Sequence, residues 1–305
     1  MKKLNSKALD YHAFPQPGKL SVSSSKTCDT AEDLSLAYTP GVAEPVLEIV
    51  KDPKNAYRFT NKGNLVAVIT NGTAVLGLGN TGALASKPVM EGKGVLFKRF
   101  ADIDVYDIEI DCEDPDEFIQ TVVNISPTFG GINLEDIAAP ECFYIESELK
   151  KRLSIPVFHD DQHGTAVIVA AGLINALEIQ QKLIEKVKIV FLGAGAAGCS
   201  CARLLKLMGA TDITMVDSKG ILSNDRKNLN QYNQDLAIDT KGKTFNDAIQ
   251  HADVFIGVSG ANLLKNEHVK SMSKKPIIFA LANPDPEMLP SEAHAIRDDI
   301  VMATG

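Results

Sequence analysis

A glycine-rich turn at residues 193–198 has the residue types and spacing of a phosphate-binding loop. An apolar run (187–192) leads into it, a segment of helical period follows, and a second apolar run (213–216) ends in Asp217. In a βαβ unit such glycines permit a tight turn, close approach of the backbone to a pyrophosphate and close packing of helix on strand. The helix N-terminus favours the phosphates, and the acid accepts hydrogen bonds from the adenosine ribose. An ordinary glycine-rich turn needs no such order of elements, so we predict a dinucleotide site formed by Asp217 with Gly193, Ala194, Gly195, Ala196, Ala197 and Gly198.

Two pairs of adjacent acids follow short apolar runs. Glu135 and Asp136 come after GGINL, and Asp160 and Asp161 come after IPVF. Packed carboxylates repel one another and are costly to desolvate, and a bound divalent cation is the usual remedy. Ligands that are all oxygen favour Mg²⁺ or Mn²⁺ over Zn²⁺. Helix capping by Asp160 and Asp161 is the alternative, but two such pairs favour a metal site.

The stretch HDDQH (159–163) also resembles a zinc metalloprotease helix, because its two histidines are separated by four positions. That motif needs a glutamate beside the first histidine as general base, and this chain has Asp160 there. A third zinc ligand is not evident downstream. The zinc peptidase interpretation is therefore much the weaker one.

These groups must be positioned by an α/β fold with two domains. We expect the second to be a Rossmann-like doubly wound domain, with the division between residues 1–159 and 160–305. Residues 1–30 are polar and predict an arm with one short helix. We expect strands at 65–70, 74–78, 101–111, 130–134, 155–158, 187–192, 213–216, 254–258, 276–281 and 300–303, and helices from 45 and at 94–100, 116–125, 141–152, 163–181 and 244–251.

Bulk composition limits the possible functions. The formal net charge of −8 argues against nucleic-acid binding, since no basic surplus can neutralise phosphates. The lysines near the N-terminus precede no apolar segment of the kind found in signal peptides. The longest apolar run, 166–177, is too short to cross a bilayer. Five cysteines without a CxxC pair predict reduced thiols and a cytoplasmic location.

Nine stretches, taken in order, resemble the malic enzymes, specifically the small bacterial type. The resemblance covers most of residues 30–305. The stretches are YTPGVAEP (38–45), GNLVAVITNGTAVLGLGN (63–80), KPVMEGKGVLFK (87–98), FGGINLEDIAAPECF (129–143), PVFHDDQHGT (156–165), GAGAAG (193–198), VDSKG (216–220), ADVFIGVS (252–259) and FALANPDPE (279–287).

This resemblance implies an N-terminal malic-enzyme domain, an NAD(P)-binding domain and oxidative decarboxylation of (S)-malate to pyruvate and CO₂ with Mg²⁺ or Mn²⁺. The reaction needs a base for the hydroxyl proton, a nicotinamide for the hydride, a Lewis acid on the new carbonyl and an acid that protonates the enolate. The implied roles are general acid for Tyr38, general base for Lys93, support of that lysine for Asp160, metal binding for Glu135, Asp136 and Asp161, and cofactor binding for Ser259 and Asn283.

Without the resemblance, a solvated lysine and a packed core tyrosine would be the simpler interpretations of Lys93 and Tyr38.

Two departures from the family pattern also matter. An arginine that grips substrate in many malic enzymes is replaced here by Ala74, so backbone N–H groups around 77–82 are expected to bind the substrate carboxylate. The family continues beyond VMATG (301–305), so we expect a chain shortened at its C-terminus with uncertain turnover.

Several alternatives therefore stay open. A malolactic enzyme would use the same groups and yield lactate, and a nucleotide-binding protein without full activity is a third possibility. The expected partners are a small-molecule substrate and further copies of the chain in a homodimer or larger homo-oligomer, without nucleic acid or membrane. Asp217 would repel a 2′-phosphate and so favours NAD⁺, although Lys219 could offset that charge and permit NADP⁺.

Overall fold

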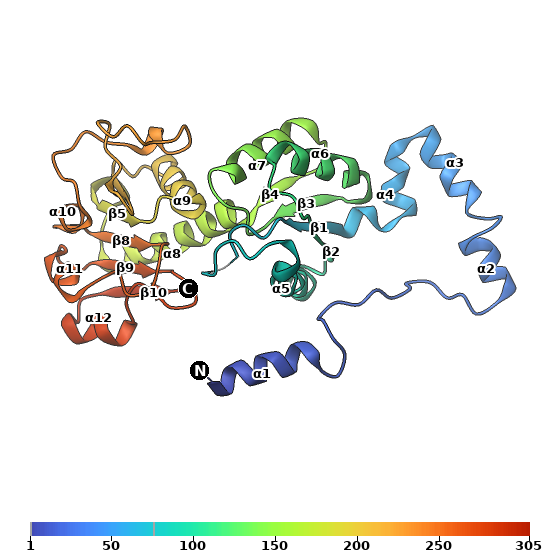
Figure 1. Ribbon diagram of the computed structural model, residues 1–305, viewed down its shortest axis with the longest axis horizontal. Helices are drawn as coiled ribbons and strands as arrows, with labels where there is room; N and C mark the ends of the chain where they lie inside the picture. Colours follow the sequence, from blue (N-terminus) through green and yellow to red (C-terminus); the bar gives the residue numbers. More distant parts are fainter. Residues whose placement is uncertain (1, 76) are drawn as a thin grey trace. The chain divides into compact units, whose positions relative to one another are not determined.

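The computed structural model describes residues 2–75 and 77–305, with side chains from residue 6 onwards. The chain forms two compact units that interleave along the sequence (Figure 1). Unit 1 contains residues 1–72, 82–135 and 148–157, and unit 2 contains 73–81, 136–147 and 158–305. Each unit has its own parallel sheet, so the predicted α/β class is confirmed. The predicted division between residues 159 and 160 stays a prediction. Unit 2 also includes residues 73–81 and 136–147, which precede that division in the sequence.

The first sheet has four strands in the order β2-β1-β3-β4, and β1 runs parallel to both β2 and β3. Its central strand is buried because Leu65, Ala67, Val68 and Ile69 have 1% exposure or less. The predicted acid pairs directly follow β3 and β4, at the ends where parallel strands present their ligand-binding groups. The strands are β1 (Leu65–Thr70), β2 (Asp104–Glu109), β3 (Gly131–Leu134) and β4 (Val157–His159).

Helix α5 (Ala83–Ala101) packs on β1 and β2 and carries Lys93. It is much longer than the predicted 94–100, and its Pro88 lies inside it. Gly94 permits close packing, since a Cβ there would lie 2.7 Å from Cδ1 of Leu20. The other helices with their bounds are α1 (Lys2–Ala13), α2 (Ala31–Ala37), α3 (Ala43–Lys51), α4 (Ala56–Phe59), α6 (Pro115–Ile125) and α7 (Glu141–Arg152).

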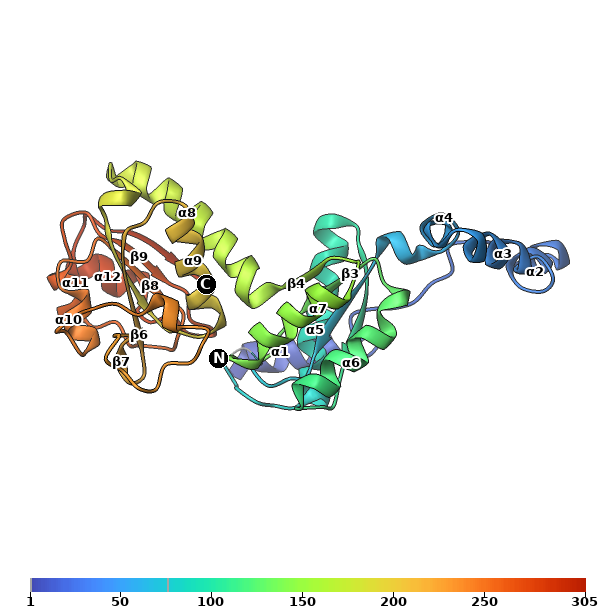
Figure 2. The same ribbon diagram turned by 90° about the horizontal axis from the view of Figure 1, so that it is seen from above.

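The short helices α2, α3 and α4 contribute no buried residue. Thr30 caps α2 with a reciprocal capping box to Asp33, so the helix is specified locally and not by packing. Figures 1 and 2 both show α2 and α3 extending away from the sheet of unit 1. Exposed apolar side chains on this segment are Leu34, Leu36, Val46, Leu47, Val50, Tyr57 and Phe59.

The second sheet has six strands in the order β10-β9-β8-β5-β6-β7. Read from β7, this is the strand order 3-2-1-4-5-6 of a doubly wound nucleotide-binding domain, with its switch point between β5 and β8. All pairs are parallel except β6 with β7. The strands are β5 (Lys188–Leu192), β6 (Asp212–Asp217), β7 (Gly220–Ile221), β8 (Val254–Gly257), β9 (Ile277–Ala280) and β10 (Val301–Thr304).

Figure 2 shows α8 and α9 on one face of this sheet and α10 to α12 on the other. The core lies between the sheet and the latter helices, where Val190, Phe255 and Ile278 are fully buried. Among the described helices none is both long and apolar enough to cross a membrane. The bounds are α8 (Thr165–Gln180), α9 (Ala196–Leu207), α10 (Phe245–Ile249), α11 (Asn266–Ser271) and α12 (Pro290–Ile296).

One predicted element is wrong. The described residues of the expected strand 74–78 form turns, with a single bridge between Val75 and Gly79, and Leu76 lies outside the described residues. The short apolar run suggested a strand, but Gly77 within it provides no side chain to pack in a sheet. Instead, the Ala74 N–H donates to the Asp136 carbonyl over 2.9 Å, which fixes the loop of unit 2.

Candidate active site

The glycine turn has the geometry predicted for a phosphate-binding loop. Gly193 has φ of +121° and would place a Cβ 2.7 Å from the Val258 carbonyl oxygen. A Cβ on Gly198 would lie 2.0 Å from the Gly193 carbonyl oxygen, so glycine alone permits the packing of α9 on β5. Gly195 has nothing within 4 Å of a built Cβ. The backbone at Gly195 is therefore open to a ligand at the N-terminus of α9.

Asp217 ends β6 as predicted, but its carboxylate is already engaged. Arg226 binds it through two hydrogen bonds, Nη2 to Oδ2 at 2.7 Å and Nη1 to Oδ1 at 2.9 Å. The Lys219 N–H donates to the same Oδ1 over 2.8 Å. Burial raises the pKa of Asp217, but these hydrogen bonds outweigh it and hold the pKa below its usual value. The sequence pattern gave no indication of the arginine.

Ser259 and Asn283 follow β8 and β9, at the same edge of the second sheet. The Ser259 N–H donates to the carboxylate of Glu287 over 3.1 Å. The backbone at Asn283 approaches the glycine loop, because a Cβ on Gly77 would lie 2.6 Å from the Asn283 carbonyl oxygen. The structure of unit 2 thus brings Asn283 beside the loop expected to bind the substrate carboxylate.

The three predicted metal ligands lie together. One carboxylate oxygen from each of Glu135, Asp136 and Asp161 lies within 4.8 Å of the others. Glu135 and Asp136 are only 5% and 4% exposed, so their charges are largely removed from water. Three acidic oxygens at this spacing suit Mg²⁺ or Mn²⁺, and a divalent cation would relieve their repulsion.

Asp136 has a backbone conformation that fits a functional site. Its φ of +52° is uncommon for a residue other than glycine. The conformation is held by a hydrogen bond from the Asp136 N–H to Oδ2 of Asp161 at 2.9 Å, within unit 2. Thr73 adds a second support, since its Oγ1 accepts a hydrogen bond from the Ala138 N–H at 2.9 Å. Backbone strain of this kind concentrates where side chains must be aimed.

A single π-helical turn, Asp160–Gly164, carries the second acid pair. Such turns are frequent at functional sites. Gly164 leaves room for the Asp160 side chain in its present position, because a Cβ would lie 2.5 Å from Oδ1 of Asp160. The turn continues directly into α8, whose first residue is Thr165.

Lys93 reaches the acid cluster through Glu135. Its Nζ lies 3.0 Å from Oε1 of Glu135, and the lysine side chain is 20% exposed. Oε2 of Glu135 accepts a hydrogen bond from Nδ2 of Asn133 at 2.9 Å. Two other lysines of α5 pair with acids outside this cluster, Lys87 with Asp107 and Lys98 with Asp104.

Sequence reasoning missed the groups that support the second acid pair. Oε1 of Glu146 accepts a hydrogen bond from the His159 N–H at 3.2 Å and contacts Nε2 of His163 at 2.7 Å. His159 is fully buried, and burial lowers the pKa of its imidazole although Asp161 and Glu146 oppose the shift. Glu146 lies on α7, away from every motif that we singled out for chemistry. Among the described residues, the group of acids and histidines placed to hold a metal is Glu135, Asp136 and Asp161, and it contains neither histidine.

Tyr38 is not brought to this cluster within one chain. It follows α2, and its side chain is 70% exposed. Figures 1 and 2 both show α2 distant from α5 and β3 in unit 1. The prediction that Tyr38 is a core tyrosine in the absence of catalysis also fails, since the ring is not packed.

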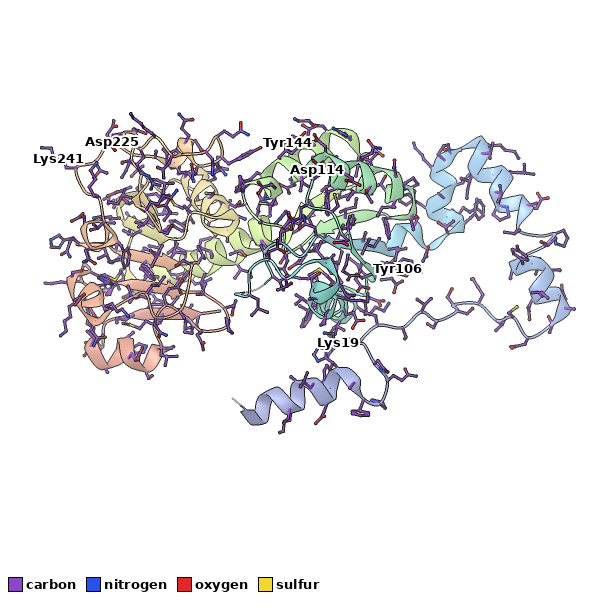
Figure 3. The ribbon with its side chains drawn as sticks, viewed as in Figure 1. Lys19, Tyr106, Asp114, Tyr144, Asp225 and Lys241 are labelled. Carbon is purple, nitrogen blue, oxygen red and sulfur yellow. The ribbon has the colours of Figure 1, made fainter. Side chains whose placement is uncertain are left out.

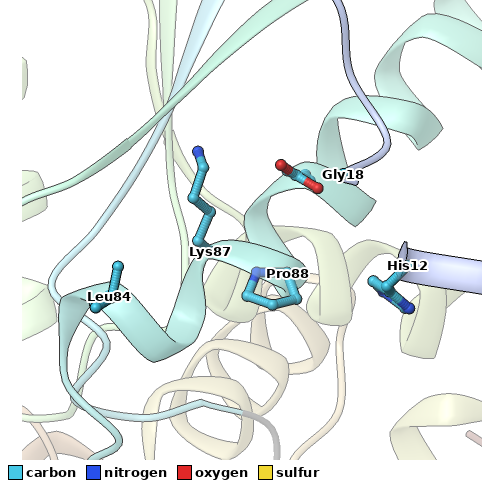
Figure 4. Close-up of a pocket in the computed structure, with 6 residues that line it drawn as sticks. His12, Gly18, Leu84, Lys87 and Pro88 are labelled. Atoms are coloured by element: carbon cyan, nitrogen blue, oxygen red, sulfur yellow. The ribbon is translucent and has the colours of Figure 1, made fainter. Parts of the chain in front are cut away.

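A pocket of about 290 Å³ lies elsewhere in unit 1, between the N-terminal arm and α5 (Figure 4). Lys19, labelled in Figure 3, contacts two of its lining residues: Nζ donates to the Pro88 carbonyl over 2.5 Å and lies 2.9 Å from Nε2 of His12. The Lys19 N–H also donates to Glu91 over 3.0 Å. The pocket contains none of the predicted site residues and is lined by His12, Gly18, Leu84, Lys87, Pro88 and Glu91.

Comparison with known proteins agrees with this geometry. Two family models match, the malic enzyme N-terminal domain over residues 17–150 and the malic enzyme NAD binding domain over residues 162–305. A solved structure of NAD-dependent malic enzyme from Thermotoga maritima is 45% identical with a TM-score of 0.93, and the match covers 98% of this chain and 80% of that one.

Two curated relatives are named NADP-dependent malic enzyme. The one from Halomonas elongata is 58% identical over 300 residues, covering 98% of this chain and 71% of the relative. The one from Haemophilus influenzae is 56% identical over 306 residues, covering 99% of this chain and only 40% of the relative. With both domain models matched in order and relatives of this identity, the chain belongs to the malic enzyme family.

Proposed function

We propose that this chain catalyses the oxidative decarboxylation of (S)-malate to pyruvate and CO₂ with reduction of NAD(P)⁺. The observation that carries the proposal is the cluster of Glu135, Asp136 and Asp161 with Lys93 at 3.0 Å from Glu135. A base beside an all-oxygen cation site is what a 2-hydroxy acid needs for oxidation. The chain spans 40% of the length of the Haemophilus relative.

Each group has one task in the proposed reaction. Glu135, Asp136 and Asp161 would hold Mg²⁺ or Mn²⁺, which polarises the substrate carbonyl and stabilises negative charge. Lys93 accepts the proton of the C2 hydroxyl as the hydride leaves for the nicotinamide. Asp160 supports Lys93 electrostatically, and Tyr38 donates a proton to the enolate carbon after CO₂ departs. Backbone N–H groups of the loop around Gly77 hold the substrate carboxylate.

The direct test is NAD(P)H formation from malate with and without Mn²⁺. We expect turnover that depends on Mn²⁺ and yields pyruvate. Lactate without net NAD(P)H would identify a malolactic enzyme instead. Nucleotide binding without turnover under all conditions would leave a binding protein and refute the proposed activity.

The nucleotide of the proposed reaction is NADP⁺. Sequence alone favoured NAD⁺, because a free Asp217 would repel a 2′-phosphate. Arg226 supports the other choice, since its two hydrogen bonds to Asp217 balance that charge. Ser218 and Lys219 remain exposed beside the pair and offer a hydroxyl and a cation for the phosphate.

The acid Tyr38 is proposed to act in a homodimer, in which one copy supplies it to the site of the other. Its 70% exposure and the absence of buried residues in α2, α3 and α4 support this assignment. Amphipathic helices bury an apolar face against something, and a second copy is the simplest partner with twofold symmetry. Leu34, Val46 and Leu47 are among the apolar side chains that the second copy would cover.

Mixing two inactive variants tests the shared site. Tyr38→Phe keeps Lys93, and Lys93→Ala keeps Tyr38, so a mixed dimer contains one intact site if the tyrosine crosses over. Random exchange should restore about a quarter of the parental activity, since half of the dimers are mixed and half of their sites are intact. If both residues of a site come from one chain, mixing restores nothing.

The free thiols of all five cysteines support a cytoplasmic location for the enzyme.

A further inference from the structure

Glu287 is a fully buried acid with no role in the proposed reaction. It lies in the loop after β9, and its side chain is 0% exposed. Its Oε1 accepts a hydrogen bond from the Ser259 N–H at 3.1 Å, and its Oε2 accepts one from the Ala282 N–H at 3.1 Å. One carboxylate thus joins the loops that follow β8 and β9.

The surrounding backbone is shaped around this carboxylate. A Cβ on Gly257, the last residue of β8, would lie 2.3 Å from Cδ of Glu287. The Glu287 carbonyl accepts a hydrogen bond from the Leu264 N–H at 3.1 Å, and the Pro286 carbonyl accepts one from the Asn262 N–H at 3.0 Å. The loop that carries Glu287 is therefore held by hydrogen bonds through its backbone as well as through the carboxylate.

The charge of Glu287 has no side-chain counterion among the described contacts. Both oxygens act as acceptors from backbone N–H groups, which is the pattern of an ionised carboxylate. Asp253, at the opposite end of β8, shows the contrast. Its Oδ1 pairs with Nζ of Lys182 at 2.6 Å, and its Oδ2 accepts a hydrogen bond from the Lys188 N–H at 3.0 Å.

We propose that Glu287 is a positioning residue for the nicotinamide half of the dinucleotide and that its charge favours the oxidised ring. This inference rests on the proposed function only in requiring that the chain bind NADP⁺ and NADPH. Ligands of doubly wound sheets lie outside the carboxyl ends of the strands, next to the β5/β8 switch point. Ser259 and Asn283 stand at those ends, and Glu287 binds the backbone of Ser259 and of the residue before Asn283.

The sign of the effect follows from the charge of the ring. Oxidised nicotinamide carries a positive charge and reduced nicotinamide is neutral. A negative charge in a site shielded from water therefore stabilises bound NADP⁺ more than bound NADPH. It also assists release of the reduced product, because hydride transfer removes the attraction. A purely structural role for Glu287 would affect the two forms alike.

The test compares dissociation constants of NADP⁺ and NADPH for the full chain and for Glu287→Gln, by calorimetry and by NADPH fluorescence. The glutamine retains the size of the side chain and removes the charge. We expect the dissociation constant of NADP⁺ to rise by about tenfold and that of NADPH by less than about threefold. Equal losses for both forms would overturn the electrostatic role, and unchanged binding of both would overturn the whole inference.

Two further variants complete the experiment. Asp253→Asn removes a half-buried acid at the other end of β8 and should leave the NADP⁺ to NADPH ratio at the parental value. Glu287→Asp keeps the charge with a shorter reach, so it should weaken both forms to the same extent. If Glu287→Gln does not fold, Glu287→Met takes its place, with the same expected shift in the ratio and the same overturning results, and a shifted ratio in Glu287→Asp also overturns the inference. Since only binding is measured, absence of malate turnover would refute the proposed function without deciding this inference.

Discussion

The ammonium nitrogen of Lys93 lies 3.0 Å from a carboxylate oxygen of Glu135, the first acid after β3. The lysine comes from a helix that packs on the sheet, and the glutamate comes from the end of a central strand. Rigid elements thus hold both partners, which is the arrangement that catalytic groups need for precise placement.

Replacing Lys93 should stop hydroxyl deprotonation while leaving later chemistry intact. Lys93→Ala should lower malate oxidation by about 10²–10⁴-fold, the usual contribution of a proton-transfer group. Ketonisation of enolpyruvate needs only the protonating acid, so it should persist in this variant and disappear in Tyr38→Phe. Lys87→Ala, on the same helix but paired with Asp107 at 2.5 Å, is the matched control. Parental ketonisation in Tyr38→Phe would return that tyrosine to a packing role.

Removing either of two acids should abolish Mn²⁺ dependence. Asp136→Ala and Asp161→Ala should each lower Mn²⁺-dependent turnover by more than about 10²-fold, because the remaining oxygens cannot complete the site. Nucleotide binding measured by fluorescence should survive in both variants. Asp212→Ala, at the exposed start of β6, should behave as the parent chain does. Normal Mn²⁺ activation in both variants would exclude the proposed cation site.

Arg226 should determine the choice of nucleotide. Arg226→Gln leaves the charge of Asp217 unbalanced, so kcat/KM with NADP⁺ should fall by about tenfold or more while that with NAD⁺ changes less. The ratio of the two values is the measurement. Arg203→Gln removes another arginine–aspartate pair of the same unit, with Asp235 at 2.8 Å, and should leave the ratio unchanged. A parental preference for NAD⁺ would contradict the assignment before any variant is made.

Asp299 should contribute to stability in acid. Hydrogen bonds from Arg297, at 2.8 and 2.9 Å, together with one from the Lys275 N–H, lower the pKa of Asp299 from 3.8 to about 2. A depressed pKa stabilises the folded chain above the unfolded value, and the contribution is lost as pH falls through the folded value. Asp299→Asn should therefore cost on the order of 1 kcal/mol at pH 7 and progressively less between about pH 4 and pH 2.

Urea unfolding at several pH values measures this difference. A destabilisation of Asp299→Asn that is constant down to pH 2 would show that packing, and not ionisation, is responsible. Asp235→Asn provides a control at a second arginine-paired acid, whose pKa is lowered by Arg203. Both pairs lie in unit 2, so the same unfolding transition reports on them.

Local patterns predicted the elements that position the site. The apolar strand at 65–70 and the helix at 141–152 match β1 and α7 at both ends. The glycine turn was predictable because Gly193 and Gly198 are required by close contacts, one with the neighbouring strand's end at Val258 and one within the turn itself. In contrast, the loop at 73–81 is organised by Asp136, Ala138 and Asn283, which are distant in sequence, so its apolar run at 74–78 wrongly predicted a strand.

Site residues were predictable where they form a recognisable sequence motif. Residues that hold the site in place from other segments were not predictable. Adjacent acids are conspicuous, and they led to Glu135, Asp136 and Asp161. Glu146, Arg226 and Glu287 stand among ordinary helix and loop residues, and only the folded chain shows that each binds a site segment. Tyr38 lies exposed after α2 in the single chain, and its role depends on the proposed second copy.

The interleaving of the two units limits which segments can be recombined between related proteins. Residues 73–81 and 136–147 belong to unit 2 although unit 1 surrounds them in the sequence. Phe143 from the second of these segments stacks on Tyr232 with ring centroids 5.0 Å apart. A single recombination point near residue 160 would therefore join a nucleotide-binding unit to foreign segments that must still pack against it. Chimeras of malic enzymes that fold well should thus carry residues 73–81 and 136–147 from the same parent as the nucleotide-binding unit.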